Sequence, residues 1–267
     1  MANELVSIPS RAVETHVHVD LTAYRPVEEF LSVWGERRAV LSEHLASADS
    51  EYIVRLVRDA PERFRGLLLL ERDLPDSTRV DVILREPHLF GARIPVHSMS
   101  DVAALDALLS GLDRRMGFAS LHCTWSVASS ASLLEVVHKH SGVDIRIEHF
   151  GSWAYDKSPR FAGPARNLLS APNVYTMVSG QYAFTSEKFP YPRASAVMRQ
   201  YVHEVGASRL MWSTDWNRND LDSGRSENYV EESFDLLGDL FSESETRDVL
   251  WRTAERFFRF VPAKGES

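Results

Sequence analysis

The chain has 267 residues, of which 44% are apolar and 25% are charged, the composition of an ordinary globular protein. A net charge of −8 argues against nucleic-acid binding, because that function needs a basic stripe that displaces counterions from phosphates. The single cysteine, Cys123, excludes an internal disulfide framework and is compatible with a reducing compartment.

The start of the chain and its apolar runs bear on where the protein acts. Residues 1–6 lack a charged region followed by an apolar stretch, so we expect no signal peptide. Apolar runs such as Leu67–Leu70 are far shorter than the ~20 residues that a membrane helix requires. We therefore expect a soluble, cytoplasmic protein with a small-molecule substrate and with neither nucleic acid nor a membrane as partner. Assembly into a homo-oligomer stays open.

Short apolar runs alternate with longer amphipathic segments along nearly the whole chain. The apolar runs predict β-strands over Val13–Val19, Arg38–Ser42, Phe64–Leu70, Gly91–Val96, Gly117–Thr124, Asp144–Phe150, Val174–Ser179 and Leu210–Ser213. The amphipathic segments predict helices over Ser50–Ala60, Asp101–Arg115, Ser129–Ser141, Arg160–Leu169, Arg193–Val205, Glu227–Leu240 and Ser244–Phe258. Segments 20–37 and 74–88 are weakly patterned. Several strand runs are continuously apolar, which is typical of strands covered on both faces of a parallel sheet.

This alternation of strands and helices fits either a (β/α)₈ barrel or a doubly wound sheet. A doubly wound nucleotide-binding sheet carries a glycine-rich turn after its first strand, whereas residues 21–24 here are Leu-Thr-Ala-Tyr. The chain length is also close to the roughly 250 residues of a barrel. Since no linker or internal repeat divides the chain, we predict an α/β fold with a single (β/α)₈ barrel domain over residues 1–267.

The sharpest chemical signal is the sequence Glu-Thr-His-Val-His at residues 14–18, on the first predicted strand. Residues two apart in a strand point to the same side, so His16 and His18 project together. Two imidazoles at the carboxyl end of a barrel strand can share one metal ion. The alternative is a polar pair on a solvated strand face. The valines at positions 13, 17 and 19 mark a buried strand, where two unpaired histidines would be costly.

A second signal, Met-Trp-Ser-Thr-Asp-Trp at residues 211–216, ends the last predicted strand. Asp215 would face the barrel mouth, where barrel enzymes keep their catalytic groups. A carboxylate beside a cation stays ionised, so Asp215 could bind a metal, take a proton from metal-bound water, or do both. The alternative role for Asp215 is that of a helix N-cap.

Two further histidines, His122 and His149, end the fifth and sixth predicted strands. Either one alone would more often be a histidine of the core or the rim. Together with the two histidines of the first strand and the strand-eight aspartate, they favour a common functional site at one end of the barrel.

These residues resemble the pattern of the amidohydrolase superfamily. The spacing is similar to its amidohydrolase-related branch, which includes small lactonases and aminocarboxymuconate-semialdehyde decarboxylase-like enzymes. Looser matches to that branch extend the resemblance over nearly the whole chain: residues 61–66, 91–93, 173–180, 206–216 and 253–258.

The resemblance implies a role for each of these residues. His16, His18 and Asp215 would bind one divalent metal ion, with His122 as a further ligand. Three imidazoles and a carboxylate suit Zn²⁺, with Mn²⁺ or Fe²⁺ as alternatives. The ion would lower the pKa of a bound water toward ~7 and polarise a carbonyl oxygen. Asp215 would shuttle the proton, and His149 would orient or polarise the substrate.

Departures from the family pattern limit what it implies. Two-metal members need a bridging lysine on the fourth strand, and residues 91–96 contain none, so we expect one metal at most. Some small lactonases of this branch work without a metal although they keep similar histidines. His122 is the position that discriminates, because it supplies the ligand that would make a tight site.

Other residues near the predicted barrel mouth are candidates for substrate binding. His44 and His97, near the ends of the second and fourth strands, could bind substrate or be plain surface histidines. Arg93 could clamp a substrate carboxylate, or it could hold the barrel interior together. Aromatic side chains that follow the last strands could wall a pocket or pack the loops: Trp125, Trp153, Tyr182 and Trp216.

The sequence thus predicts a metal-dependent hydrolase that acts on a small carbonyl compound, a lactone or an amide, through a metal-activated water. The first alternative is decarboxylation of a small unsaturated or aromatic acid on the same site. Two others are a metal-free lactonase and a catalytically silent barrel that binds a ligand.

Overall fold

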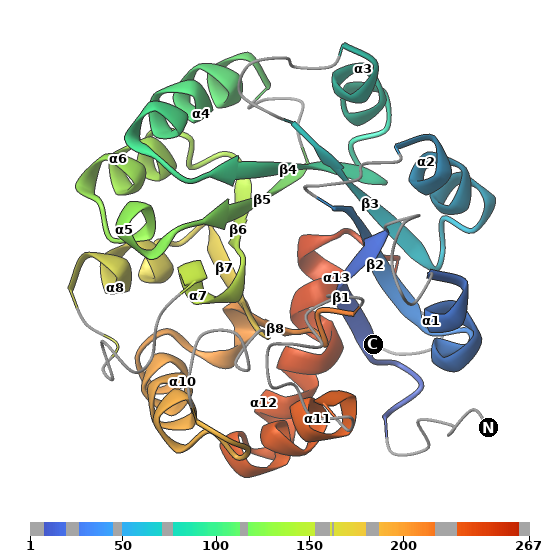
Figure 1. Cartoon of the computed structure of the whole chain (residues 1–267), viewed down its shortest axis with the longest axis vertical. Helices are drawn as coiled ribbons and strands as arrows, with labels where there is room; N and C mark the ends of the chain where they lie inside the picture. The colour runs from blue at the N-terminus through green and yellow to red at the C-terminus, as the bar shows by residue number, and fades with distance from the viewer. Residues whose placement is uncertain are drawn as a thin grey trace.

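The computed structural model describes residues 8–19, 27–44, 50–70, 77–112, 117–152, 161, 163–179, 187–216 and 229–261. Eight strands form one sheet in chain order, and every neighbouring pair from β1 to β8 is parallel. An isolated bridge between Val17 and Trp216 joins the first strand to the end of the last, so the strands form a nearly closed barrel (Figure 1). The strands are β1 (Val13–Val19), β2 (Arg38–Glu43), β3 (Phe64–Leu69), β4 (Phe90–Val96), β5 (Phe118–Cys123), β6 (Asp144–Ile147), β7 (Val174–Val178) and β8 (Leu210–Trp212).

Helices surround the ring of strands, as expected when each parallel strand is followed by a crossover (Figure 1). They are α1 (Val27–Trp34), α2 (Ser50–Asp59), α3 (Ser77–Arg85), α4 (Met99–Leu112), α5 (Trp125–Ala128), α6 (Ala131–Lys139), α7 (His149–Ser152), α8 (Gly163–Ser170), α10 (Pro192–Val205), α11 (Tyr229–Leu240), α12 (Glu243–Arg247) and α13 (Thr253–Phe257). A 3₁₀ turn, Ala207–Arg209, precedes β8, and a π-helical segment, Asp248–Arg252, joins α12 to α13. None of the helices in these described ranges is long and apolar enough to cross a membrane.

The predicted barrel is confirmed, and each predicted strand overlaps an observed one. The prediction for the sixth strand was wrong at its end, because β6 stops at Ile147 and not at Phe150. Residues 149–152 form a short turn in which every φ is positive, between 51° and 72°. Positive φ values are incompatible with an extended strand, so the chain leaves the sheet before His149. Gly151 adopts such a conformation without steric cost. The two weakly patterned segments contain α1 and α3, which the sequence did not predict.

Residues 254–260, near the C-terminus, fill the barrel interior at the amino ends of the strands. Apolar side chains of six strands meet a cluster of aromatic residues from α13 and the residues after it: Val13, Val40, Leu67, Phe118, Met177 and Met211 contact the group of Ala254, Phe257, Phe258 and Phe260. Phe257 is fully buried, and its ring centroid lies 4.9 Å from that of Tyr175. The guanidinium of Arg65 donates hydrogen bonds to the carbonyl oxygens of Phe258 and Arg259, both at 2.8 Å. This aromatic plug, residues 254–260, closes the barrel at the end opposite the carboxyl ends of the strands.

The aromatic plug predicts a large and local stability effect. Replacing Phe257 with Ala should lower the free energy of unfolding by about 3–5 kcal/mol, because it removes a fully buried ring and leaves a cavity. Urea denaturation measures this change. The matched control is Val261→Ala, at a position 75% exposed, which should change stability by less than about 0.5 kcal/mol. Equal effects of the two substitutions would show that the plug does not seal the barrel.

Candidate active site

Three buried imidazoles gather where β1, β6 and β8 end. His16 and His18 lie on β1, and their ring centroids are 4.5 Å apart, as the two-residue repeat of a strand predicts. His149, on the turn after β6, has its ring centroid 5.7 Å from that of His16. The sequence prediction that these three histidines converge is therefore consistent with their observed positions.

Asp215 lies at the centre of this group. Its Oδ1 is 3.2 Å from His18 Nε2, 3.8 Å from His16 Nε2 and 3.9 Å from His149 Nε2. The residue follows β8 in the left-handed region with φ 58°, a conformation that aspartate tolerates better than most residues. Its backbone N–H donates to Ser213 Oγ at 3.0 Å, which fixes the turn that carries the carboxylate.

Asp215 is ionised in this environment. Burial by itself would raise the pKa of the carboxyl group, but His149, His18 and His16 outweigh burial and hold that pKa well below its usual range. Burial lowers the pKa of His18 to about 4, although the hydrogen bond with Asp215 works in the opposite direction. At the centre of the site, the Asp215 carboxylate therefore accepts a hydrogen bond from His18, whose ring is neutral.

The Nδ1 side of the His16 ring contacts an arginine. Nη2 of Arg146 lies 3.2 Å from His16 Nδ1, and Ser42 Oγ lies 3.3 Å from the same nitrogen. Burial lowers the pKa of His16 well below its usual value, although the charge of Glu148 acts in the opposite direction, so the ring is neutral. A guanidinium can only donate, so the contact with Arg146 is a hydrogen bond in the tautomer that carries the single ring proton on Nε2.

This proton faces the interior of the site. His16 Nε2 is buried and has no hydrogen-bond partner among the described residues. The nearest carboxylate oxygens, Asp215 Oδ1 and Glu148 Oε2, are 3.8 and 3.9 Å away. An unpaired buried N–H is costly, so a ligand that brings an acceptor to this position would gain a strong hydrogen bond.

Sequence reasoning missed the charged residues beneath the histidines. Glu148 is fully buried and accepts two hydrogen bonds from Arg93, at 3.0 and 2.9 Å, and one from Ser120 at 2.8 Å. Burial would raise the pKa of Glu148, but Arg93 and then His16 hold it well below its usual range. The signal that could have found this layer is the repeated occurrence of charged residues inside predicted strands, as with Arg146 and Glu148 in the strand predicted over Asp144–Phe150.

Arg93 was predicted either to clamp a substrate carboxylate or to hold the barrel interior together. Its guanidinium is engaged by Glu148 through two hydrogen bonds and donates a third, of 2.7 Å, to the backbone oxygen of Glu43. With its side chain only 2% exposed, Arg93 occupies the interior position of the second alternative.

Glu14 joins β1 to β8 where the ladder between these strands is sparse. The pairing of β1 with β2 is irregular between Glu14 and Val17. Among the described residues, a single isolated bridge, between Val17 and Trp216, links β1 to the segment after β8. The buried Glu14 carboxylate accepts from the backbone N–H of His16 at 3.0 Å and of Thr214 at 2.8 Å, and from the hydroxyl of Ser213. Glu14 therefore ties the strand that carries the two histidines to the turn that carries Asp215.

The burial of Glu14 predicts a measurable pH dependence of stability. Burial raises the pKa of Glu14 from 4.5 to about 7, although its hydrogen bonds favour the anion. The folded state thus binds this proton more tightly than the unfolded state. The resulting stabilisation is complete below about pH 4.5 and is lost as the pH rises through about 7. The unfolding free energy of the wild type, relative to that of Glu14→Gln, should fall by about 3 kcal/mol across this interval.

Urea denaturation of both proteins at pH 4.5 and pH 8 measures this difference. A stability difference that does not change with pH would mean that Glu14 ionises in the folded protein as it does in the unfolded chain.

The described site contains groups that could hold a metal ion. The ligand atoms of His16, His18 and Asp215 lie within 4.8 Å of one another, as do those of His16, Glu148 and His149. In number and spacing, the first group suits a divalent ion. A histidine that binds a metal, however, normally donates its other N–H to a carboxylate, carbonyl or water. Nδ1 of His16 faces a donor instead, so His16 in this arrangement does not fit the role of a metal ligand.

His122 belongs to neither of these groups of described residues. Its Nδ1 lies 2.8 Å from Nε2 of His97, and the two rings form an edge-to-face pair with centroids 5.0 Å apart. Burial lowers the pKa of His122 to about 3. The structure thus pairs two of the predicted site residues with each other at the carboxyl ends of β4 and β5, and the ligand role of His122 stays a prediction.

The remaining predicted residues differ in their contacts with the site. The ring of His44 packs edge-on against His18 at 5.1 Å between centroids. Trp216 is buried and packs against Phe30 at 5.4 Å, as a loop-packing residue would. Trp125 begins α5 and packs against the core. Tyr182, like Trp153, lies outside the described residues.

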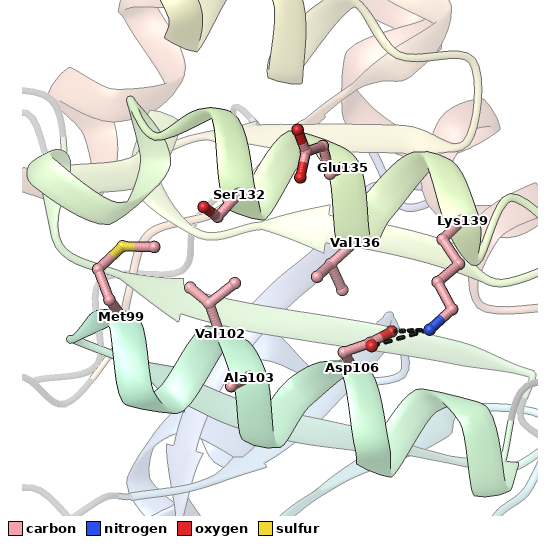
Figure 2. A pocket seen from close by; sticks show the side chains of 8 residues that line it. All are labelled: Met99, Val102, Ala103, Asp106, Ser132, Glu135, Val136 and Lys139. Atoms are coloured by element: carbon pink, nitrogen blue, oxygen red, sulfur yellow. Dashed lines mark hydrogen bonds and ion pairs between the residues drawn. The ribbon is translucent and has the colours of Figure 1, made fainter.

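A separate cavity of about 340 Å³ lies on the outside of the barrel, between α4 and α6 (Figure 2). Apolar side chains and an ion pair line it, and none of the predicted site residues takes part. The Asp106 carboxylate contacts Lys139 Nζ at 2.8 Å across this groove (Figure 2). The groove therefore shares no lining residue with the histidine group at the carboxyl ends of the strands.

Comparison with known proteins places this geometry in context. Residues 15–260 match the sequence model of a family described as Amidohydrolase. No curated protein matches the chain. A candidate 2-pyrone-4,6-dicarboxylic acid hydrolase from Pseudomonas putida superposes with a TM-score of 0.76 at 24% identity, covering 96% of this chain and 100% of the other.

Two further solved structures share the fold. A protein from Acinetobacter baumannii with the same assigned activity, solved with citric acid bound, has a TM-score of 0.71 at 18% identity, covering 94% of this chain and 100% of the other. An amidohydrolase from Burkholderia multivorans with bound zinc has a TM-score of 0.68 at 14% identity, covering 93% and 99%.

Proposed function

The chain belongs to the amidohydrolase family, and we propose that it is an enzyme that hydrolyses a small carbonyl compound, a lactone or an amide. One observation carries this proposal: an ionised carboxylate and an unpaired imidazole N–H, Asp215 Oδ1 and His16 Nε2, lie 3.8 Å apart in a buried site. These are the two groups that hydrolysis requires, a base for the water and a donor for the carbonyl oxygen.

The proposed reaction uses groups that are already in place. Asp215 takes a proton from a water molecule, and the resulting hydroxide attacks the carbonyl carbon of the substrate. The carbonyl oxygen becomes an oxyanion that accepts a hydrogen bond from His16 Nε2–H. As the tetrahedral intermediate collapses, the bond to the leaving oxygen or nitrogen breaks, and Asp215 returns its proton to that atom. Water is consumed, and a carboxylic acid and an alcohol or amine are formed.

His149 and His18 would orient the substrate and the Asp215 carboxylate, respectively. Nδ1 of His149 lies 2.7 Å from Ser179 Oγ, which fixes the ring so that Nε2 faces Asp215. We assign His149 to orienting or polarising the substrate. His18, which is hydrogen-bonded to Asp215, holds the carboxylate in the orientation needed to reach the water.

A second candidate is the metal-dependent form of the same hydrolysis, and the spacing of His16, His18 and Asp215 favours it. These residues, with His122 as a further ligand, would hold one divalent ion, Zn²⁺ first and Mn²⁺ or Fe²⁺ as alternatives. Such an ion supplies Lewis acidity toward a carbonyl oxygen and lowers the pKa of water. For this candidate, the proton of His16 must move from Nε2 to Nδ1.

Two tests separate the candidates. Lactones, amides and carboxylated aromatic acids are screened for turnover, beginning with a 2-pyrone carboxylate, since two solved relatives are named for that substrate class. The purified protein is then assayed before and after dialysis against a chelator. Retained activity supports the metal-free hydrolase, and loss that added Zn²⁺ restores supports the metal-dependent one. Release of CO₂ without consumption of water would contradict hydrolysis altogether.

The role of Asp215 as base predicts the effect of its amide variant. Asp215→Asn should lower kcat by about 10²–10⁴-fold, because the amide keeps the shape of the side chain but cannot take up the proton. Steady-state kinetics on the substrate found in the screen measure this change. The control Asp81→Asn makes the same chemical change on the exposed face of α3 and should leave kcat unaltered. If Asp215→Asn kept more than half of the wild-type kcat, another residue would be the base.

A further inference from the structure

Arg146 reaches from the aromatic plug to the catalytic group. It lies on β6 with its side chain fully buried, and its guanidinium carbon sits 5.3 Å from the ring centroid of Phe258. Its Nε donates to Ser120 Oγ at 2.9 Å, and its Nη1 donates to the backbone oxygen of Thr15. The third contact is Nη2 with His16 Nδ1, at 3.2 Å. Because each guanidinium nitrogen has a partner and the plug lies against one face, Arg146 cannot turn away from His16.

The contact with His16 can run in one direction only. A guanidinium carries five N–H donors and no acceptor, so the imidazole must supply its Nδ1 lone pair. Ser42 Oγ, 3.3 Å from the same nitrogen, is a hydroxyl that can donate to this lone pair as well, so neither contact requires a proton on Nδ1. With one proton on the neutral ring, that proton is on Nε2, the nitrogen that points at Asp215.

We propose that Arg146 fixes the proton of His16 on Nε2 and thereby keeps a divalent metal ion out of the group formed by His16, His18 and Asp215. A metal ion needs the Nε2 lone pair and an acceptor for the proton on Nδ1. By holding the proton on Nε2, Arg146 removes the lone pair that would bind the metal. Its own N–H groups also lie where an acceptor for a proton on Nδ1 would be needed. His18 adds to the effect, because its buried Nδ1 has no hydrogen-bond partner among the described residues to orient it as a ligand.

The charges of the buried layer support the same conclusion. Arg93 is paired with Glu148. Burial lowers the pKa of Arg146 to about 10, and the carboxylates of Glu148, Glu14 and Asp215, in that order, act against burial. Glu14, whose pKa burial raises to about 7, adds at most one further negative charge. Two guanidinium groups thus already compensate these carboxylates, so a dication placed at Asp215 would add positive charge that is not matched in a buried site.

The test is a Zn²⁺ titration of three proteins by competition with a chromophoric chelator. After chelator dialysis, the wild type should bind Zn²⁺ weakly. Arg146→Gln places a carbonyl oxygen where it can accept the Nδ1 proton, and it should bind one Zn²⁺ at least ~10-fold more tightly than the wild type. The matched control is Arg65→Gln, a second buried arginine against the aromatic plug that bonds only backbone oxygens and should match the wild type. Adding His16→Ala to Arg146→Gln should abolish the gain.

A wild type that binds one equivalent of Zn²⁺ as tightly as Arg146→Gln would overturn the proposal. A second measurement needs no variant of Arg146, should that variant not fold. The ¹⁵N chemical shifts of the His16 ring in the wild type, assigned by comparison with His16→Ala, should show the proton on Nε2. A proton on Nδ1 would contradict the proposal. The inference rests on the His16 Nε2–H that the proposed metal-free hydrolysis uses, but these readouts do not involve turnover. If they fail, hydrolysis on a metal ion remains as the other form of the proposed function.

Discussion

Burying charge inside the barrel is the constraint on which the site depends. A charge removed from water must find a partner, and here Arg93, Glu148 and Arg146 do so through other residues of the barrel interior. Arg93 pairs with Glu148, Arg146 donates to His16, and Ser120 links the two arrangements by contacting both Arg146 and Glu148. This layer lies between the aromatic plug below and the histidines above. Its donors and acceptors determine which nitrogen of His16 carries a proton, and hence what chemistry the site offers.

The closure of the barrel between β1 and β8 also determines the geometry of the site. β1 and β8 carry most of the reactive groups but are joined by few backbone contacts, so a side chain completes the join. Glu14 accepts from the backbone of both segments and from the hydroxyl of Ser213, which in turn accepts from the backbone of Asp215. The distance between the histidines and the catalytic carboxylate is thus set by the fully buried carboxylate of Glu14. A single buried glutamate serves both the fold and the site.

Much of the barrel could be predicted from the sequence, because strands covered on both faces are continuously apolar and stand out from amphipathic helices. The convergence of His16, His18 and Asp215 followed from strand geometry and from the position of the last strand. Arg93 was predicted, as one of two alternatives, to hold the barrel interior together. Its buried partners were not predicted, because a charged residue within a strand is more often interpreted as solvated and because its partner lies far along the chain. Arg146 and Thr15 are separated by 131 positions, and Glu14 and Thr214 by 200. The end of β6 was missed because the left-handed turn at His149 leaves little trace in hydropathy.

The central claim is that an imidazole N–H of His16, opposite an ionised Asp215, stabilises the oxyanion in place of a metal ion. A crystal structure with a boronate or phosphonate analogue of the tetrahedral intermediate tests it most directly. The account predicts an analogue oxygen about 2.7–3.1 Å from His16 Nε2, with Asp215 beside the oxygen that stands for the attacking water. An analogue oxygen bound to a metal ion held by His16, His18 and Asp215 would contradict it.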